Sequence, residues 1–144
     1  MTTESEIERR FQGLGGVFLT PAAAMAARLP VIRALLYDWD GVFNIGMKGE
    51  SIRSSFSEPD SMGSNMLRYA LWRAQGRMPV CAIISGEYNP TARQFAMREH
   101  FHEVYTGMMA AGHVGLAVRK IVTGIQPNRV LIHNILTEQI ILLG

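Results

Sequence analysis

Four short apolar segments constrain most strongly how this chain can fold. Three of them contain several β-branched or leucine residues, the fourth is the short segment "EVY", all are too short for typical helices, and the segments between them have helical periodicity. Strands that are apolar along their whole length need cover on both faces, and alternation with helices favours parallel pairing with right-handed crossovers. The sequence therefore predicts an α/β fold with a doubly wound parallel sheet. The predicted strands are residues 31–37, 79–85, 103–105 and 129–135.

Segments with helical periodicity lie before and between these predicted strands. A Thr-Pro pair at residues 20–21 and an Asn-Pro pair at residues 89–90 are typical of helix starts, and Gly76 suits a helix end. Met62 and Met66 recur with the helical period and are expected to pack in the core. The predicted helices are 21–29, 62–75 with a cap at Asp60 or Ser61, 91–101 and 113–123, and the polar residues 1–10 are expected to be loosely ordered.

The composition is that of one globular domain. The chain has 144 residues, of which 48% are hydrophobic and 18% are charged, which is enough to bury one core. The net charge is +2, but Lys and Arg are scattered and form no cationic run, so nucleic-acid binding is not expected. No segment has the length of a membrane span and residues 1–10 lack a signal-peptide pattern, so we expect a cytoplasmic protein without membrane attachment.

The spacing of cysteine and histidine does not indicate a metal site. The single Cys81 lies inside an apolar segment, so it is expected to be a buried core residue, and a disulfide within the chain is impossible. The histidines lack the spacing of zinc ligands, and the first two are expected at the surface near a helix end. The four histidines are His100, His102, His113 and His133.

Polar residues follow two of the predicted strands at the point where each strand ends. Asp38 and Asp40 follow the first strand, and Ser85 and Gly86 follow the second. In an open α/β sheet, ligands bind beyond the carboxyl ends of the strands, near the point where the strand order reverses. Both polar clusters are therefore expected at the edge where a site forms.

These residue types suit phosphoryl transfer. Two carboxylates separated by one residue can point the same way, so that one attacks phosphorus while the other transfers the proton. Mg²⁺ would balance the two negative charges. The Ser85 hydroxyl and the Gly86 backbone N–H can donate to a phosphate oxygen. The alternative is an acidic turn without chemistry, because Asp and Gly are common turn residues.

Three motifs together resemble the haloacid dehalogenase (HAD) superfamily. They are "LLYDWDGVFN" at 35–44, "SFSEPDSMGSNML" at 55–67 and "AIISGEYNPTARQFAMREHF" at 82–101. Within that superfamily they are similar to the small, capless phosphatases that resemble 3-deoxy-D-manno-octulosonate 8-phosphate phosphatase. The resemblance covers residues 11–107 and implies a Rossmann-like core with a small β-hairpin flap and no large cap domain.

The resemblance implies a Mg²⁺-dependent phosphomonoesterase that hydrolyses a small, sugar-like phosphate through an aspartyl-phosphate. Asp38 would be the nucleophile and a Mg²⁺ ligand, and Asp40 would be the general acid/base and a ligand through its carbonyl. Ser85 and Gly86 would hold the phosphate. Asp60 would lie before the helix that borders the substrate pocket.

The resemblance also implies an assembly. Residues 43–56 would form the hairpin flap by which such phosphatases assemble as tetramers and close a neighbour's active site. A homo-oligomer is therefore expected. The chain, as one HAD-like domain over residues 1–144, ends before such a domain would complete its last strands and helix, so the C-terminal part of the fold is expected to be missing.

Several positions depart from the pattern of that superfamily. No lysine stands in register after residues 103–107, where the nearest basic residues are His113, Arg119 and Lys120. His133 and Asn134 occupy the place of an acidic pair, where Asn134 could offer Mg²⁺ an oxygen and Glu138 is the only carboxylate nearby. Glu87 follows Ser-Gly, where a basic residue is common.

These departures support a second hypothesis beside the phosphatase. The chain could be a catalytically impaired HAD-fold module that binds a ligand or takes part in an oligomeric assembly. The two hypotheses differ in one property, because only the phosphatase needs Asp38 and Asp40 for turnover.

Overall fold

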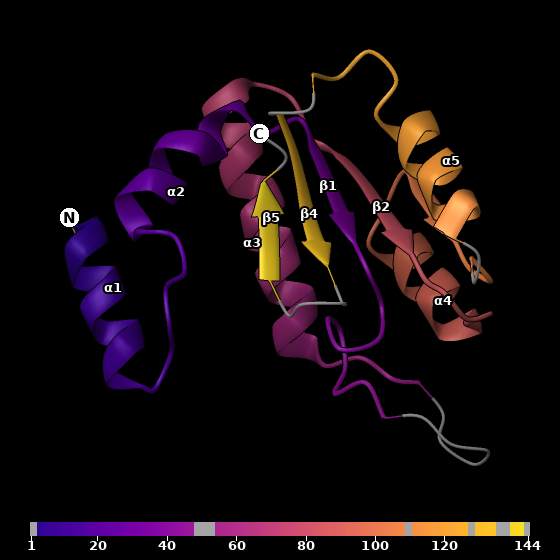
Figure 1. The fold of residues 1–144 in the computed structure, drawn as a ribbon, viewed down its shortest axis with the longest axis horizontal. Helices are drawn as coiled ribbons and strands as arrows, with labels where there is room; N and C mark the ends of the chain where they lie inside the picture. Colours follow the sequence, from indigo (N-terminus) through magenta and orange to yellow (C-terminus); the bar gives the residue numbers. More distant parts are fainter. Residues whose placement is uncertain (1–2, 48–53, 109–110, 127–128, 135–138, 143–144) are drawn as a thin grey trace. The chain divides into compact units, whose positions relative to one another are not determined.

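The structure is a computed structural model, which describes residues 3–47, 54–108, 111–126, 129–134 and 139–142 (Figure 1). Two compact units divide the chain, Met1–Val31 and Ile32–Gly144. None of the helices within the described ranges is both long and apolar enough to cross a membrane.

The second unit is built on one open sheet. Among the described residues, five strands pair in the order β3-β2-β1-β4-β5 (Figure 1). The pairs between β3, β2, β1 and β4 are parallel, as predicted, whereas β5 pairs antiparallel with β4 at the edge and was not predicted as a strand. The strands are β1 Ala34–Tyr37, β2 Val80–Ile84, β3 Glu103–Tyr105, β4 Val130–Asn134 and β5 Gln139–Leu142.

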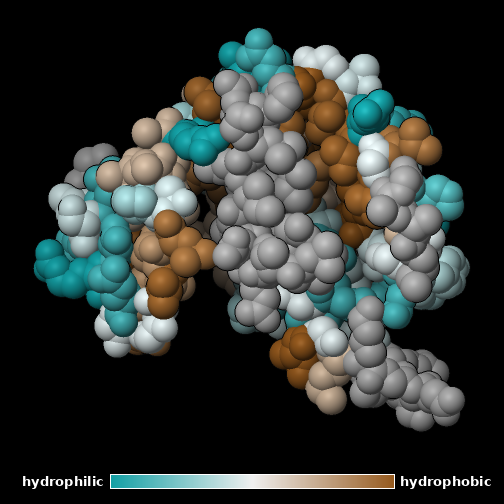
Figure 2. Space-filling view, viewed as in Figure 1, coloured by the Kyte–Doolittle hydropathy of each residue, from teal (hydrophilic) through white to brown (hydrophobic). Residues whose placement is uncertain are grey.

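Helices cover both faces of this sheet, which confirms the predicted α/β class. Helix α5, Ala111–Ile121, lies in front of the sheet in Figure 1, and α3, Glu58–Gln75, lies behind it. Figure 2 shows hydrophobic residues gathered where α5 meets the sheet. They belong to a core cluster in which Ile121 packs with alternate residues of the central strands, Ala34, Leu36, Ala82 and Val130.

Two predicted boundaries were wrong for local reasons. Leu29–Val31 form a turn of 3₁₀ helix, so β1 begins at Ala34 and not at residue 31. Helix α3 begins at Glu58, because the Ser57 hydroxyl, and not Asp60 or Ser61, caps it by accepting the Asp60 backbone N–H at 3.3 Å.

The Asn-Pro prediction was right, although the helix is shorter than predicted. Helix α4 spans Pro90–Arg98, and the Asn89 side chain accepts the Ala92 backbone N–H at 3.1 Å. The predicted end at residue 101 was wrong because His100 has a φ of +55°, which lies in the left-handed region and ends the helix. His100 and His102 are exposed, as expected.

The prediction that the α3 methionines lie in the core was wrong. Met62 and Met66 are 61% and 68% exposed. The buried face of α3 instead contains Arg68, which donates to the carbonyl oxygens of Glu99 at 2.6 Å and His100 at 3.3 Å. These bonds turn a polar face of α3 toward the end of α4, and the methionines lie on another face.

The first unit consists of helices α1, Glu4–Gly13, and α2, Ala22–Arg28, followed by the 3₁₀ turn. The expectation of a loose segment over residues 1–10 was wrong for residues 4–10. The Thr3 hydroxyl caps α1 at the Glu6 backbone N–H, and Glu6 pairs with Arg10 at 2.6 Å. Pro21, not Thr20, is the cap position of α2.

The predicted hairpin flap over residues 43–56 stays a prediction. Residues 43–47 and 54–56 contain no strand, and residues 48–53 lie outside the described ranges.

Candidate active site

The two predicted polar clusters lie at the carboxyl edge of the sheet, on neighbouring strands. Tyr37 of β1 pairs with Ile83 of β2, so Asp38 and Ser85 come immediately beyond the two strands. Asp38 is 6% exposed and Ser85 is 1% exposed, whereas Asp40 and Gly86 are partly exposed. A ligand that enters this edge from the solvent would meet a buried carboxylate and a buried hydroxyl.

An aromatic cluster fixes the loop that contains the two aspartates. Gly41 has a φ of +81°, which allows the chain to turn directly after Asp40. The Trp39 carbonyl accepts the Phe43 backbone N–H at 3.0 Å and closes this turn. Trp39 and Phe43 are buried, and both rings pack against Phe95 of α4, with centroids 5.4 and 4.6 Å apart. The backbone of the loop is therefore held in one conformation.

The Asp40 carboxylate is held by two side chains that the sequence analysis missed. Asn44 Nδ2 donates to Asp40 Oδ1 at 3.3 Å, and the Ser54 hydroxyl donates to the same oxygen at 3.2 Å. Ser54 Oγ also accepts from Trp39 Nε1. Both bonds to Asp40 use Oδ1, so the carboxylate has a fixed orientation, as a group that transfers a proton needs.

Backbone hydrogen bonds tie the loop after β2 to the loop after β3. The Ser85 N–H donates to the Tyr105 carbonyl at 2.8 Å, and the Ser85 carbonyl accepts the Met108 N–H at 3.1 Å. The Gly107 N–H donates to the Glu87 carbonyl at 3.0 Å. Because the backbone of Ser85 is used in this pairing, a contact from Ser85 to a phosphate would have to come from its hydroxyl.

Arg93 places a cation at the same edge, and sequence reasoning did not single it out. It lies in the first turn of α4, which begins at the carboxyl edge because α4 follows β2 directly. Arg93 Nε donates to the Thr106 hydroxyl at 3.3 Å, and its guanidinium carbon lies 5.9 Å from the Tyr88 ring centroid. Thr106 is buried immediately after β3, so it anchors the guanidinium between two of the site loops.

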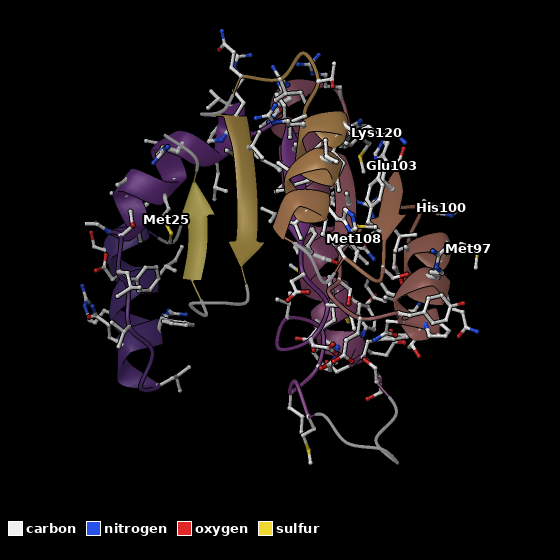
Figure 3. All side chains as sticks on the ribbon, turned by 45° about the vertical axis from the view of Figure 1, so that its right-hand side comes forward. Met25, Met97, His100, Glu103, Met108 and Lys120 are labelled. Atoms are coloured by element: carbon white, nitrogen blue, oxygen red, sulfur yellow. The ribbon has the colours of Figure 1, made fainter. Side chains whose placement is uncertain are left out.

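Two of the basic residues after β3 lie in the last turn of α5. Helix α5 starts near the carboxyl edge and ends before β4 starts, so Arg119 and Lys120 in its last turn lie toward the amino edge. In Figure 3, Lys120 lies beside Glu103. Interaction with the Tyr105 hydroxyl and the charge of Glu103 raise the pKa of Lys120.

His113 lies in the first half of α5 and is exposed. It lines a shallow cleft of about 370 Å³ together with Tyr105, Met108 and Lys120. Among the three basic residues after β3, His113 is therefore the one on the carboxyl half of α5.

The register of β4 with β1 places Asn134 at the carboxyl edge. Tyr37 pairs with His133, so the register carried one residue further puts Asn134, the last residue of β4, level with Asp38. Glu138 lies outside the described ranges. Within the described residues, no group of three His, Cys, Asp or Glu side chains is placed to hold a metal ion.

Asp60 has a structural partner in the first turn of α3. Its carboxylate accepts from the Ser57 hydroxyl, and its backbone N–H donates to the same hydroxyl. Asp60 is exposed. Helix capping therefore explains why an acidic residue is present at this position. The role of Asp60 in a substrate pocket stays a prediction.

Solved structures with a similar fold include phosphatases and a hydrolase of the HAD superfamily. A deoxy-D-mannose-octulosonate 8-phosphate phosphatase from Haemophilus influenzae, in a cobalt-bound form, is 23% identical, with a TM-score of 0.55 over 73% of this chain and 59% of that one. The 3-deoxy-D-manno-octulosonate 8-phosphate phosphatase from Moraxella catarrhalis, in complex with magnesium, phosphate and KDO, is 16% identical, with a TM-score of 0.57 over 76% and 60%. A protein from Legionella pneumophila assigned to the HAD superfamily, subfamily III A, is 20% identical, with a TM-score of 0.56 over 74% and 56%.

These similarities establish the class of fold. The second unit has the Rossmann-like α/β fold of HAD hydrolases, which confirms at the level of fold the resemblance that the three motifs indicated. The chain spans between 56% and 60% of the length of the three structures named above. No family model matches the chain, and no curated protein is significantly similar to it in sequence.

Proposed function

We propose that this chain is a phosphomonoesterase of the HAD type, with Asp38 as nucleophile and Asp40 as general acid/base. The observation that supports this most is the position of a buried carboxylate, Asp38, and a buried hydroxyl, Ser85, directly beyond two adjacent parallel strands. The oriented Asp40 carboxylate next to them supplies the second group that the reaction needs.

The proposed reaction has two steps. An oxygen of the Asp38 carboxylate attacks phosphorus, the P–O bond to the substrate alcohol breaks, and Asp40 gives its proton to the departing oxygen. Asp40, now a carboxylate, takes a proton from a water molecule as that water attacks the aspartyl-phosphate. The P–O bond to Asp38 breaks and inorganic phosphate leaves. The Ser85 hydroxyl and the Gly86 N–H would hold the phosphate oxygens in both steps.

The donor set of the edge suits Mg²⁺. Asp38 and Asp40 would offer hard oxygen ligands, and Asn134, level with Asp38 in the sheet, would offer a neutral one. When bound, the ion would offset the charge of the two acids and of the phosphate. Arg93 is the cation that we propose in place of the missing lysine, because Thr106 anchors it between the site loops.

The proposed substrate is a small, sugar-like phosphate. It is suggested by the phosphatase from Moraxella catarrhalis, whose structure contains phosphate and KDO, and by the motifs shared with the capless phosphatases. A homo-oligomer whose flaps close neighbouring sites belongs to the same proposal. If Asp60 borders the pocket, Asp60→Asn should raise KM without changing the free energy of unfolding by more than about 1 kcal/mol.

The test is phosphate release from a panel of sugar phosphates and an aryl phosphate, with and without Mg²⁺. Turnover by the wild type that requires Mg²⁺ and disappears in Asp38→Asn would support the phosphatase. Glu103→Gln is the matched control, because it removes an exposed acid on β3. If wild type and Asp38→Asn release phosphate equally slowly, the phosphatase proposal is wrong.

The second candidate is a catalytically impaired binding or assembly module. It is supported by the positions of Arg119 and Lys120 in the last turn of α5 and by the neutral residues at the end of β4. In that case, Mg²⁺ binding measured by calorimetry should be feeble or absent. Asp38→Asn should then raise the free energy of unfolding, because it removes one of two neighbouring negative charges.

A further inference from the structure

The amino edge of the sheet, opposite the proposed active site, contains three arginines. Arg77, Arg33 and Arg129 come shortly before β2, β1 and β4, which are adjacent strands in the sheet. Because parallel strands start at the same edge, the order of the strands brings together three cations that are far apart in the sequence.

Backbone hydrogen bonds place Arg33 at the centre of this edge. Its N–H donates to the Arg129 carbonyl at 2.7 Å, and its carbonyl accepts the Val80 N–H at 2.8 Å. The Arg33 guanidinium donates to Gln75 Oε1, and Gln75 Nε2 in turn donates to the Ile32 carbonyl at 2.6 Å. The central guanidinium is therefore oriented by a neutral amide, and none of the described acidic residues forms an ion pair with it.

The three arginines line a cleft of about 520 Å³. The turn after α5 forms its opposite wall through Thr123, Gly124 and Gln126. None of the described residues that line this cleft is acidic. A cleft of this volume is within the range of small-molecule sites.

The positive charges of this cleft repel one another. Burial, and then the charges of Arg77 and Arg129, lower the pKa of Arg33. Arg33 Nε is buried, and no described residue accepts its hydrogen. A bound anion would offset the repulsion among the three cations, since guanidinium groups bind phosphate oxygens through paired N–H donors.

We propose that this arginine cleft binds a small polyanion that bears two or more phosphate groups. The three positive charges at this cleft exceed the single negative charge of a monoanion, so a ligand with several negative charges matches them better. The volume limits the ligand to a small molecule, and the scattered charge of the remaining surface does not favour a nucleic-acid strand. This proposal does not depend on the activity proposed for the other edge.

The experiment uses inorganic pyrophosphate as the probe, titrated calorimetrically into the full chain in buffer without divalent metal. Wild type should bind, and Arg33→Gln and Arg129→Gln should each weaken binding about tenfold or more. Arg119→Gln is the matched control, because it removes the same charge from an exposed position that does not line the cleft. Arg33→Lys, which keeps the charge but loses the paired donors, should give an intermediate affinity.

A further variant distinguishes binding at the amino edge from binding at the carboxyl edge. Ser85→Ala changes the proposed phosphate site at the carboxyl edge and should leave pyrophosphate binding in metal-free buffer unchanged. The proposal is overturned if wild type does not bind pyrophosphate, or if Arg119→Gln weakens binding as much as Arg129→Gln. It is also overturned if the single substitution Ser85→Ala abolishes binding. Should Arg33→Gln fail to fold in thermal unfolding, Arg129→Gln and the exposed Arg77→Gln provide the same comparison.

Discussion

The Ser54 hydroxyl donates a hydrogen bond to Asp40 Oδ1 at 3.2 Å, although 14 residues separate the two in the chain. Ser54 thereby joins the segment that precedes α3 to the loop that follows β1. Through Trp39 Nε1, the same hydroxyl also contacts the aromatic cluster beneath that loop. The orientation of Asp40 therefore depends on a residue outside the Asp-x-Asp motif.

Ser54→Ala should lower kcat on the best phosphate ester about tenfold, because it removes one of the two donors that orient Asp40. The free energy of unfolding should fall by about 1 kcal/mol. Steady-state kinetics and urea denaturation measure the two effects. Ser55→Ala, at an exposed neighbouring position, should change neither quantity. An unchanged kcat in Ser54→Ala would show that the bond does not assist proton transfer.

Arg93→Met should lower kcat/KM by a factor of about 10 to 100, because the variant removes the anchored cation proposed to offset phosphate charge. Arg93→Lys should recover part of this loss by restoring the charge. Inhibition by the product, inorganic phosphate, should weaken in parallel in Arg93→Met. If kcat/KM is the same in Arg93→Met and wild type, another cation fulfils this role.

Asn134→Asp should bind Mg²⁺ about tenfold more tightly than the wild type, because a carboxylate level with Asp38 would add a charged ligand. Calorimetric titration with Mg²⁺ measures this directly and does not require turnover. Asp38→Asn should weaken binding in the same assay. Equal Mg²⁺ affinity in Asn134→Asp and wild type would place the ion away from the end of β4.

Arg68→Met should reduce the free energy of unfolding by about 2 to 4 kcal/mol, since it leaves the carbonyl groups of Glu99 and His100 without their buried donor. It also removes the contact of the guanidinium with the Phe101 ring, 5.1 Å from its centroid. Urea denaturation monitored by circular dichroism provides the value. Arg73→Met, on the exposed face of α3, should cost less than about 0.5 kcal/mol.

Cys81 should make the fold less stable at high pH. Burial raises the pKa of this thiol to about 11 in the folded state, whereas the unfolded chain loses the proton near pH 8.5 to 9. Deprotonation therefore stabilises the unfolded state relative to the folded state as pH rises from about 9 to 11. The free energy of unfolding should fall by about 2 kcal/mol over that window. Denaturation between pH 8 and 11 measures this loss, and Cys81→Ala should reduce its slope.

The sequence predicted well those features that depend on neighbouring residues. The cap at Asn89 and the end of the first strand at Tyr37 follow from local composition, because a polar residue directly after an apolar run ends the element. The parallel order of the first four strands follows from their alternation with helices. The positions of Asp38 and Ser85 at the carboxyl edge were predictable for the same reason, since they follow the ends of their strands.

Features that depend on distant partners were missed. The period of α3 shows that Met62 and Met66 share a face, but it does not show that Arg68 would find acceptors at the end of α4, some 31 residues away. Asn44 and Ser54 resemble ordinary loop residues until the fold brings them to Asp40. Helix α1 was missed because its residues are polar, and its stability comes from the Thr3 cap and the pair between Glu6 and Arg10 rather than from an apolar face.

The burial of Trp39 gives the aspartate loop an intrinsic optical probe. Trp39 is completely buried, whereas Trp72, the other tryptophan of the chain, is 42% exposed. In a Trp72→Phe variant, the tryptophan fluorescence would come from Trp39 alone. Trp39 lies between Asp38 and Asp40 in the sequence, and its indole N–H donates to the Ser54 hydroxyl, which in turn donates to Asp40. Its emission wavelength and its protection from acrylamide quenching would then report on the conformation of this loop, in the presence or absence of any ligand.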